Sequence, residues 1–114
     1  MKLKLEKNLK IINEMVTYFK KLGNKDIHID FTSDETKSLF LISGDVTNIS
    51  NEKLNDLSNI LNKPRQPEVE ECYWQLNGES EIECEVTLIG VMIDSAKVEY
   101  NNGILTVELL RKEN

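Results

Sequence analysis

The amino-acid sequence predicts an α+β fold, with a single domain covering residues 1–114 and an antiparallel sheet of about five strands. Three observations carry this prediction. Apolar residues near the amino terminus recur at helical spacing, several short segments alternate between apolar and polar residues, and an Asn-Gly pair separates two of those segments. The predicted order is a helix, two strands, a helix, a short helix and three strands, with the helices packed on one face of the sheet.

The first predicted element is a long amphipathic helix from Leu5 to Leu22. Its apolar residues follow steps of three and four and form two neighbouring rows: Leu5, Leu9, Ile12, Val16 and Phe19, and Ile11, Met15, Tyr18 and Leu22. Gly23, directly after Lys20 and Lys21, is typical of a helix C-terminus. The apolar face is wider than one sheet requires, so we expect part of it to meet another helix or a second subunit.

Two strands are predicted next. Residues 26–31 alternate strictly between polar and apolar types, which indicates a half-buried strand. After a polar turn, the segment from Ser38 to Ser43 contains an unbroken apolar run, which predicts a central strand covered on both faces. His28 lies on the polar side of the first strand, and we interpret it as a surface residue.

Two helices follow in the prediction. Ser50 is suited to cap a helix whose apolar face contains Leu54, Leu57 and Leu61, and this helix ends before Pro64. Pro67 suits the first position of a second, shorter helix. Its first turn is acidic and its apolar face contains a set of four residues: Val69, Cys72, Tyr73 and Leu76.

The segment from Glu81 to Leu110 predicts a three-stranded antiparallel meander. Its first strand alternates Ile82, Cys84, Val86 and Leu88 with polar residues. Gly90 interrupts the alternation, so we expect a bulge or a sharp bend there. The pair Asn102-Gly103 is typical of a two-residue hairpin turn. That turn sets the pairing of Tyr100 with Leu105, Val98 with Val107, Ala96 with Leu109 and Lys97 with Glu108.

The overall composition is that of an ordinary globular protein, 39% apolar and 30% charged, with a formal charge of −6. The negative charge argues against direct binding to nucleic acid, which draws on Lys and Arg contacts to phosphates. The sequence has no run of about 18 apolar residues, so no membrane span is predicted. The first residues also lack an apolar stretch of signal-peptide length, and we therefore expect a cytoplasmic protein.

The cysteine and histidine content predicts no metal or cofactor. Cys72, Cys84 and His28 are too few for a four-ligand zinc site within one chain. Both cysteines occupy apolar-patterned positions, so we interpret them as buried thiols. The Asp, Asn and Gly spacing of a calcium loop is also absent.

Acidic residues are the only abundant chemical groups, and they do not form a recognisable catalytic pattern. Paired carboxylates catalyse proton transfer when burial separates their pKa values, but these carboxylates are predicted on solvated faces. The sequence contains no nucleophile motif and no Gly-rich phosphate loop. We therefore predict a non-catalytic protein.

One resemblance to a known family covers roughly a quarter of the chain, within residues 88–107. It rests on three stretches: Leu88-Ile89-Gly90-Val91, Lys97-Val98-Glu99-Tyr100 and Asn102-Gly103-Ile104-Leu105-Thr106-Val107. They resemble the strands of the small heat-shock protein (α-crystallin domain) family. Ile89 stands where the family motif has proline, and the chain stops before the family's last strands. The resemblance implies an ATP-independent chaperone that binds client proteins and oligomerises.

The preferred functional interpretation is a protein-interaction or adaptor-type domain. The surplus apolar helix face around Val16 and Phe19, with Tyr73 and Trp74, would meet another protein or a second copy in a homodimer. The alternative for each of these residues is that it fills the core of the domain itself.

A further interpretation rests on Glu81, Glu83 and Glu85, which would share one face of a strand. Such an acidic face can occupy the basic groove of a nucleic-acid-binding protein, as acidic inhibitor proteins do. The alternative is a solvated acidic strand without a partner.

Overall fold

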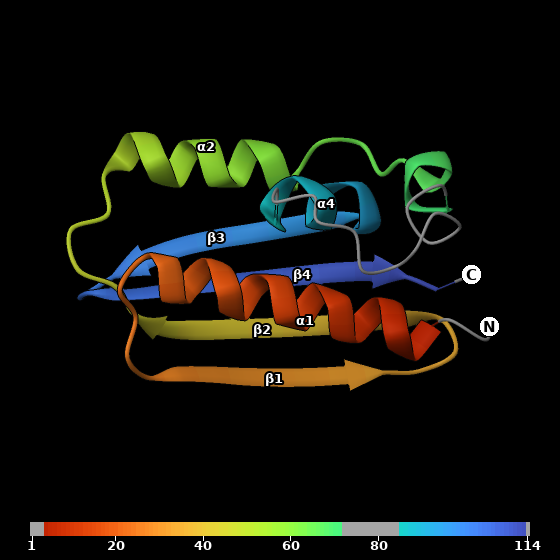
Figure 1. The fold of residues 1–114 in the computed structure, drawn as a ribbon, viewed down its shortest axis with the longest axis horizontal. Helices are drawn as coiled ribbons and strands as arrows, with labels where there is room; N and C mark the ends of the chain where they lie inside the picture. Colours follow the sequence, from red (N-terminus) through yellow and green to blue (C-terminus); the bar gives the residue numbers. More distant parts are fainter. Residues whose placement is uncertain (1–3, 72–84, 114) are drawn as a thin grey trace.

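A computed structural model of the chain describes residues 4–71 and 85–113, and within these ranges the fold is α+β, as predicted. The described strands are β1 (Ile27–Ser33), β2 (Lys37–Asp45), β3 (Ser95–Asn101) and β4 (Ile104–Lys112). They form one antiparallel sheet in the order β1-β2-β4-β3. Helices α1 (Lys4–Lys21), α2 (Asn51–Leu61) and α4 (Glu85–Met92) lie together on one face of it (Figure 1).

Helix α1 confirms the first predicted element to within one residue at each end. Ile11, Met15 and Phe19, spaced four residues apart, are fully buried and form one row along the helix. Gly23 follows the last turn with a φ of 84°, and its N–H donates to the carbonyl oxygen of Lys20. The buried row fixes which side of α1 faces the sheet.

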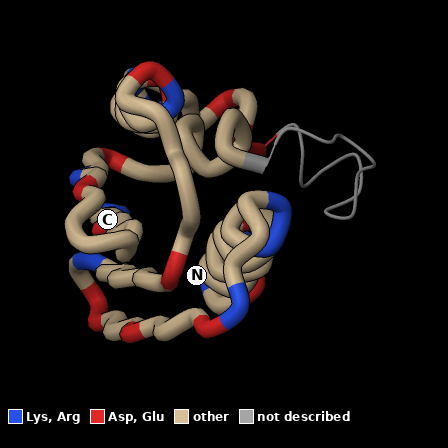
Figure 2. Tube along the Cα trace, turned by 90° about the vertical axis from the view of Figure 1, so that its left-hand side faces the viewer, with Lys and Arg blue, Asp and Glu red and all other residues tan. Residues whose placement is uncertain are grey.

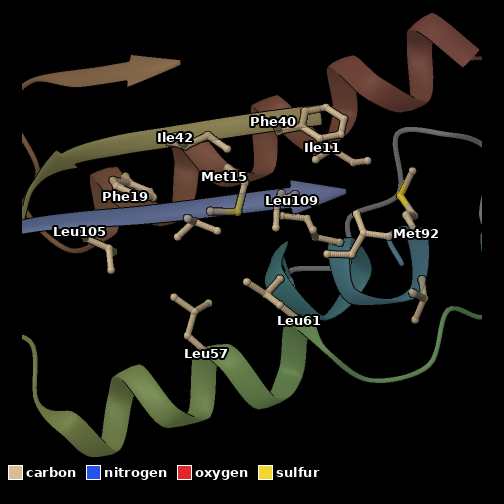
Figure 3. Close-up of a cluster of buried hydrophobic side chains, with 14 of the residues drawn as sticks. Ile11, Met15, Phe19, Phe40, Ile42, Leu57, Leu61, Met92, Leu105 and Leu109 are labelled. Atoms are coloured by element: carbon tan, nitrogen blue, oxygen red, sulfur yellow. The ribbon is translucent and has the colours of Figure 1, made fainter. Parts of the chain in front are cut away.

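The hydrophobic core lies between the inner face of the sheet and the three helices. Side chains from α1, the two central strands, α2 and α4 point into one interior (Figure 3). Its largest fully buried side chains include Phe19, Phe40, Ile42, Leu57, Leu61, Met92, Leu105 and Leu109. At roughly 1.5–3 kcal/mol for each fully buried large apolar side chain, this interior is the main favourable contribution to folding.

The carboxy-terminal hairpin confirms its predicted register. Tyr100 lies opposite Leu105, and the pairs Val98–Val107, Ala96–Leu109 and Lys97–Glu108 follow in the same ladder. Asn102 and Gly103 adopt positive φ angles of 53° and 78°, which is the geometry of a primed two-residue turn. Turn chemistry and side-chain alternation therefore select one pairing.

Strand β2 lies in the interior of the sheet, as predicted, but only one of its faces is covered. Phe40 and Ile42 are fully buried, whereas Leu39 and Leu41 are 36% and 38% exposed on the opposite face. The prediction that both faces are covered was wrong, because all three labelled helices pack on the same side. An unbroken apolar run does not by itself distinguish two covered faces from one.

The predicted strand from Ile82 to Leu88 is also wrong where the structure describes it. Residues from Glu85 onward form helix α4, so the described sheet has four strands instead of about five, and Gly90 lies in a helix instead of a bulge. Ile89, Val91 and Met92 are buried, and α4 contacts both α1 and α2. A short apolar run is compatible with either a strand or a buried helix, and here tertiary packing decides.

The remaining helices begin as predicted. Ser50 caps α2, and its hydroxyl oxygen accepts a hydrogen bond from the backbone N–H of Lys53 at 3.1 Å. Residues 67–71 are helical, starting at Pro67. The rest of the predicted short helix, including Cys72, lies outside the described residues.

Gly90 permits the close approach of α4 to α2. A Cβ at this position would lie 2.5 Å from the carbonyl oxygen of Ile60, a backbone atom that cannot move without shifting α2. Gly90→Ala should therefore lower the free energy of unfolding by about 1–3 kcal/mol, despite the better helix propensity of alanine.

The Gly90→Ala prediction is checked by urea unfolding. Thr87→Ala is the matched control, because Thr87 is exposed on the same helix and its replacement should change stability by less than about 0.5 kcal/mol. A stability equal to or above that of the wild type in Gly90→Ala would show that α2 and α4 are not in tight contact.

Candidate functional site

A row of apolar side chains runs along one flank of α1 and is only partly covered. Leu5 and Leu9 are 60% and 51% exposed, and Ile12 and Val16 continue the row as half-buried residues. We call Leu5, Leu9, Ile12 and Val16 the α1 stripe. Exposed apolar side chains that adjoin one another indicate an interaction surface more strongly than scattered ones do.

The direction of the α1 stripe follows from the position of Lys7. The ammonium group of Lys7 lies 2.7 Å from a carboxylate oxygen of Glu70, which places this side of α1 toward the helical segment 67–71. At about 100° per residue, the stripe lies roughly 140–200° around the helix from Lys7. The stripe therefore faces the opposite flank, toward β1, and Figure 1 shows α1 between α4 and β1.

Strand β1 is an edge strand beside this stripe. Its inward-facing residues Ile27, Ile29 and Phe31 are only half-buried, because α1 packs against β2 more closely than against β1. The Phe31 ring stacks on Phe40 with centroids 5.1 Å apart, which anchors β1 to the core on one side only. The α1 stripe and the inner face of β1 together form one partly uncovered apolar surface, which we call the α1–β1 surface.

Side-chain hydrogen bonds fix both ends of β1. At its start, the Asp45 carboxylate accepts the N–H groups of Asp26 at 2.9 Å and Lys25 at 3.2 Å, and these bonds lower the pKa of Asp45. In the turn after β1, the Asp34 carboxylate accepts the N–H of Thr36 at 2.8 Å, which lowers the pKa of Asp34. These side chains therefore hold in place a strand that has only one neighbour, β2, in the described sheet.

A cluster of buried charges lies on the other flank of α1. Glu70 accepts two hydrogen bonds from the Arg111 guanidinium, both 3.0 Å, and pairs with Lys7 at 2.7 Å. Lys7, Glu70 and Arg111 are only 3–4% exposed. Glu113 extends the cluster, because it accepts hydrogen bonds from Arg111 at 3.3 Å and from the Ser38 hydroxyl.

The pKa shifts in this ionic cluster favour the charged forms. Burial opposes the ionisation of Glu70, but hydrogen bonds and charges from Arg111 and Lys7 outweigh it and hold the pKa of Glu70 below its ordinary value. Burial likewise opposes the charge of Lys7, and its acidic neighbours Glu70 and Glu71 raise the pKa of Lys7 nonetheless. General acid–base catalysis needs the opposite shifts, which bring the pKa of a carboxyl group or an amine closer to neutral pH. We therefore assign the cluster a structural role, joining α1, the segment 67–71 and β4.

The structure separates the residues that the sequence suggested for an interaction surface. Val16 belongs to the half-buried α1 stripe, whereas Phe19 is fully buried in the core and is not accessible to a partner. Glu85 begins helix α4 instead of lying on a strand. The other suggested residues lie outside the described part of the chain: Tyr73, Trp74, Glu81 and Glu83.

Sequence reasoning missed the ionic cluster, although one signal was present. Arg111 continues the alternation of Leu105, Val107 and Leu109, so it occupies an inward-facing position of β4. A charged residue in the buried phase of a strand requires a buried partner. The identity of that partner, Glu70, depends on tertiary structure and has no local signal.

Neither the distribution of charges nor the comparison with known proteins identifies a function for this chain. Acidic and basic residues are interspersed along the described chain instead of gathering at separate ends (Figure 2). Among the described residues, no His, Cys, Asp and Glu side chains group in a way that could hold a metal ion, and no described helix is long and apolar enough to cross a bilayer. The chain matches no protein-family model and no curated protein.

Proposed function

We propose that this chain is a non-catalytic protein-interaction domain whose binding surface is the α1–β1 surface. The observation that carries the proposal is the exposure of Leu5 and Leu9 on the flank of α1 that faces β1, a strand that pairs with β2 alone among the described strands. Edge strands provide backbone hydrogen-bonding groups, and adjacent apolar side chains provide the area that a partner can bury.

The α1–β1 surface is favoured over the other exposed apolar residues for a physical reason. On the outer face of the sheet, Leu41 lies opposite Glu108 and Ile104 lies opposite Asp45, so charged side chains border the exposed apolar ones there. These residues belong to β2 and β4, each of which is already paired with a strand on both sides. At β1, by contrast, one partner can bury apolar side chains and satisfy backbone groups together.

Site-specific photo-crosslinking in cells tests this proposal. A photo-reactive amino acid at position 9 should form a defined adduct with a protein, and the same group at position 104 should not. Ile104 is the matched control, because it is an apolar residue of similar exposure, 43%, on the outer face of the sheet. The substitution Leu9→Lys should prevent the adduct when the photo-reactive group is placed at position 5 instead.

Two results would contradict the interaction surface. Equal adduct yields at positions 9 and 104 would show that the α1–β1 surface has no preference over an ordinary exposed side chain. Absence of any protein adduct at positions 5 and 9, with the protein folded by circular dichroism, would show that this surface does not bind a protein.

A further inference from the structure

We propose that the partner at the α1–β1 surface is a second copy of this chain, joined through antiparallel pairing of β1 with β1. This inference rests on the proposed interaction function and specifies its partner. Three features carry it: the direction of the free backbone groups of β1, the pairing register that its side chains allow, and the place of the α1 stripe relative to that seam.

The free backbone groups belong to the residues with apolar side chains. The N–H of Asp34 donates to the carbonyl oxygen of Lys37 at 2.9 Å, so this pair is a hydrogen-bonded pair of the β1–β2 ladder. Hydrogen-bonded and non-hydrogen-bonded pairs alternate in an antiparallel ladder. Hence Ile27, Ile29 and Phe31 direct their N–H and C=O groups away from β2, toward the open edge.

The opposite edge of the sheet is different. The edge N–H of Ala96 in β3 donates to the Asn62 side-chain oxygen at 3.0 Å, and helix α2 contacts β3. No described strand or helix occupies the corresponding position beside β1. A second strand can therefore add at β1 without displacing a described element.

One pairing register of two β1 strands gives favourable side-chain contacts on both faces of the sheet. With a twofold axis at Ile29, this residue lies opposite Ile29 of the second copy, and Ile27 lies opposite Phe31 of the second copy. On the other face, His28 lies opposite Asp30 of the second copy, and symmetry repeats this pair. Every apolar side chain then meets an apolar one, and the two histidine–aspartate contacts are favourable.

Neighbouring registers lose these contacts. A centre at Asp30 places the two Asp30 carboxylates directly opposite each other, which is repulsive. A centre at Phe31 leaves Ile27 without a partner in the other strand. Within β1 and β2, His28 and Asp30 face Ser43 and Leu41, so no charged side chain across that ladder competes for them.

Pairing of β1 with β1 also places the α1 stripe, the remaining part of the α1–β1 surface, next to the second copy. A twofold axis perpendicular to the sheet keeps both α1 helices on the same face, with their stripes directed toward the shared seam. Three strand spacings of about 4.8 Å separate the two β2 strands, or roughly 14 Å. Because α1 contacts β2 more than β1, the two α1 helices would lie about this far apart, with their stripes facing each other across the two β1 strands.

Charge-reversal pairs test the register by analytical ultracentrifugation over a range of concentrations. The wild type should be a dimer. His28→Asp alone should weaken dimerisation by about tenfold, because it places two carboxylates opposite each other at two symmetric sites, whereas Asp30→Lys alone should weaken it less, because it only removes the histidine–aspartate contact. The double variant His28→Asp/Asp30→Lys should recover dimerisation. Asp56→Lys, an equivalent charge change at an exposed site of α2, should have no effect.

Mixing the two single variants gives the most specific readout. In a mixed pair, one cross-strand contact joins the introduced aspartate to the introduced lysine and the other keeps the histidine–aspartate pair of the wild type, so native mass spectrometry should show heterodimers in excess over either homodimer. A random mixture of dimers, or a wild type that is monomeric at all concentrations, would overturn β1 pairing. If the position 9 adduct then contains a different protein, the interaction function stands and only the second copy is rejected.

Discussion

Glu70→Leu should lower the free energy of unfolding by about 3–5 kcal/mol, the cost of leaving buried charges without their partner. Lys7 and Arg111 are almost fully buried, and both lose their main counter-charge in this variant. Burial opposes both positive charges, and Glu70 is the first of the groups that raise the pKa of Lys7 and of Arg111, so its removal leaves two buried cations with much weaker compensation. Urea unfolding followed by circular dichroism measures the loss.

Glu71→Leu is the matched control for this prediction. Glu71 also pairs with Lys7, but its side chain is 53% exposed, so its removal should cost less than about 1 kcal/mol. If both glutamate variants lost the same stability, the burial of Glu70 would have no energetic significance.

A variant that removes all three charges distinguishes the loss of charge pairing from the loss of side-chain packing. In Lys7→Met/Glu70→Leu/Arg111→Met, all three charges are replaced by apolar groups of similar length. Replacement of a buried ionic triad is often neutral or stabilising, and Glu113, which loses Arg111 in this variant, keeps its hydrogen bonds from Ser38 and Asn8. The triple variant should therefore be more stable than Glu70→Leu alone, and equal instability of the two would indicate that the loss arises from packing.

The ionic cluster also sets the direction of acid sensitivity. Because the pKa of Glu70 is lower in the folded state than its ordinary value of 4.5, the unfolded chain binds a proton more readily. The contribution of Glu70 to stability is thus fully present above pH of about 5 and is lost as pH falls through its folded pKa. Glu70→Leu should show a smaller loss of stability over this acidic range than the wild type.

Phe19→Ala should lower the free energy of unfolding by about 3–5 kcal/mol, because it opens a cavity in a fully buried row of α1. Leu9→Ala is the control on the same helix, and its half-exposed side chain should contribute much less. Thermal and urea unfolding of both variants would check the difference. Similar losses for the two would mean that Leu9 is covered in solution, even in the monomer.

The two substitutions also separate folding from function. Phe19→Ala should act on stability in the isolated chain, whereas Leu9→Lys should act on partner binding. This division was not available from the sequence, in which Phe19 and Val16 both belong to the apolar rows of one helix. Helical periodicity shows that a face is apolar, and only the docking of α1 shows which part of it is covered.

Local chemistry explains what the sequence predicted well. The Asn102-Gly103 turn and the alternation around it concern residues within a few positions of each other, and the pairing of Val98 with Val107 follows from them. The Ser50 cap is local in the same sense. For such features, neighbouring residues supply most of the determining interactions.

The errors concern features determined by distant residues. The strand predicted through Val86 and Leu88 is a helix where it is described, because the apolar run is enclosed by α1 and α2. The pairing of Glu70 with Arg111 joins segments far apart in the chain. The open edge at β1 depends on strand order, which alternation does not determine.

The pairing of β2 with β4 has a consequence for how the chain folds. Each hairpin, β1–β2 and β3–β4, forms between segments that are neighbours in the sequence. The pairing of β2 with β4 instead joins Asp45 to Ile104, which are more than half the chain apart. Loop closure over such a span costs entropy before any contact compensates it. We therefore expect the meeting of the two hairpins to limit the rate of folding. Extra residues between the hairpins should slow folding only slightly, since closure entropy rises with the logarithm of loop length.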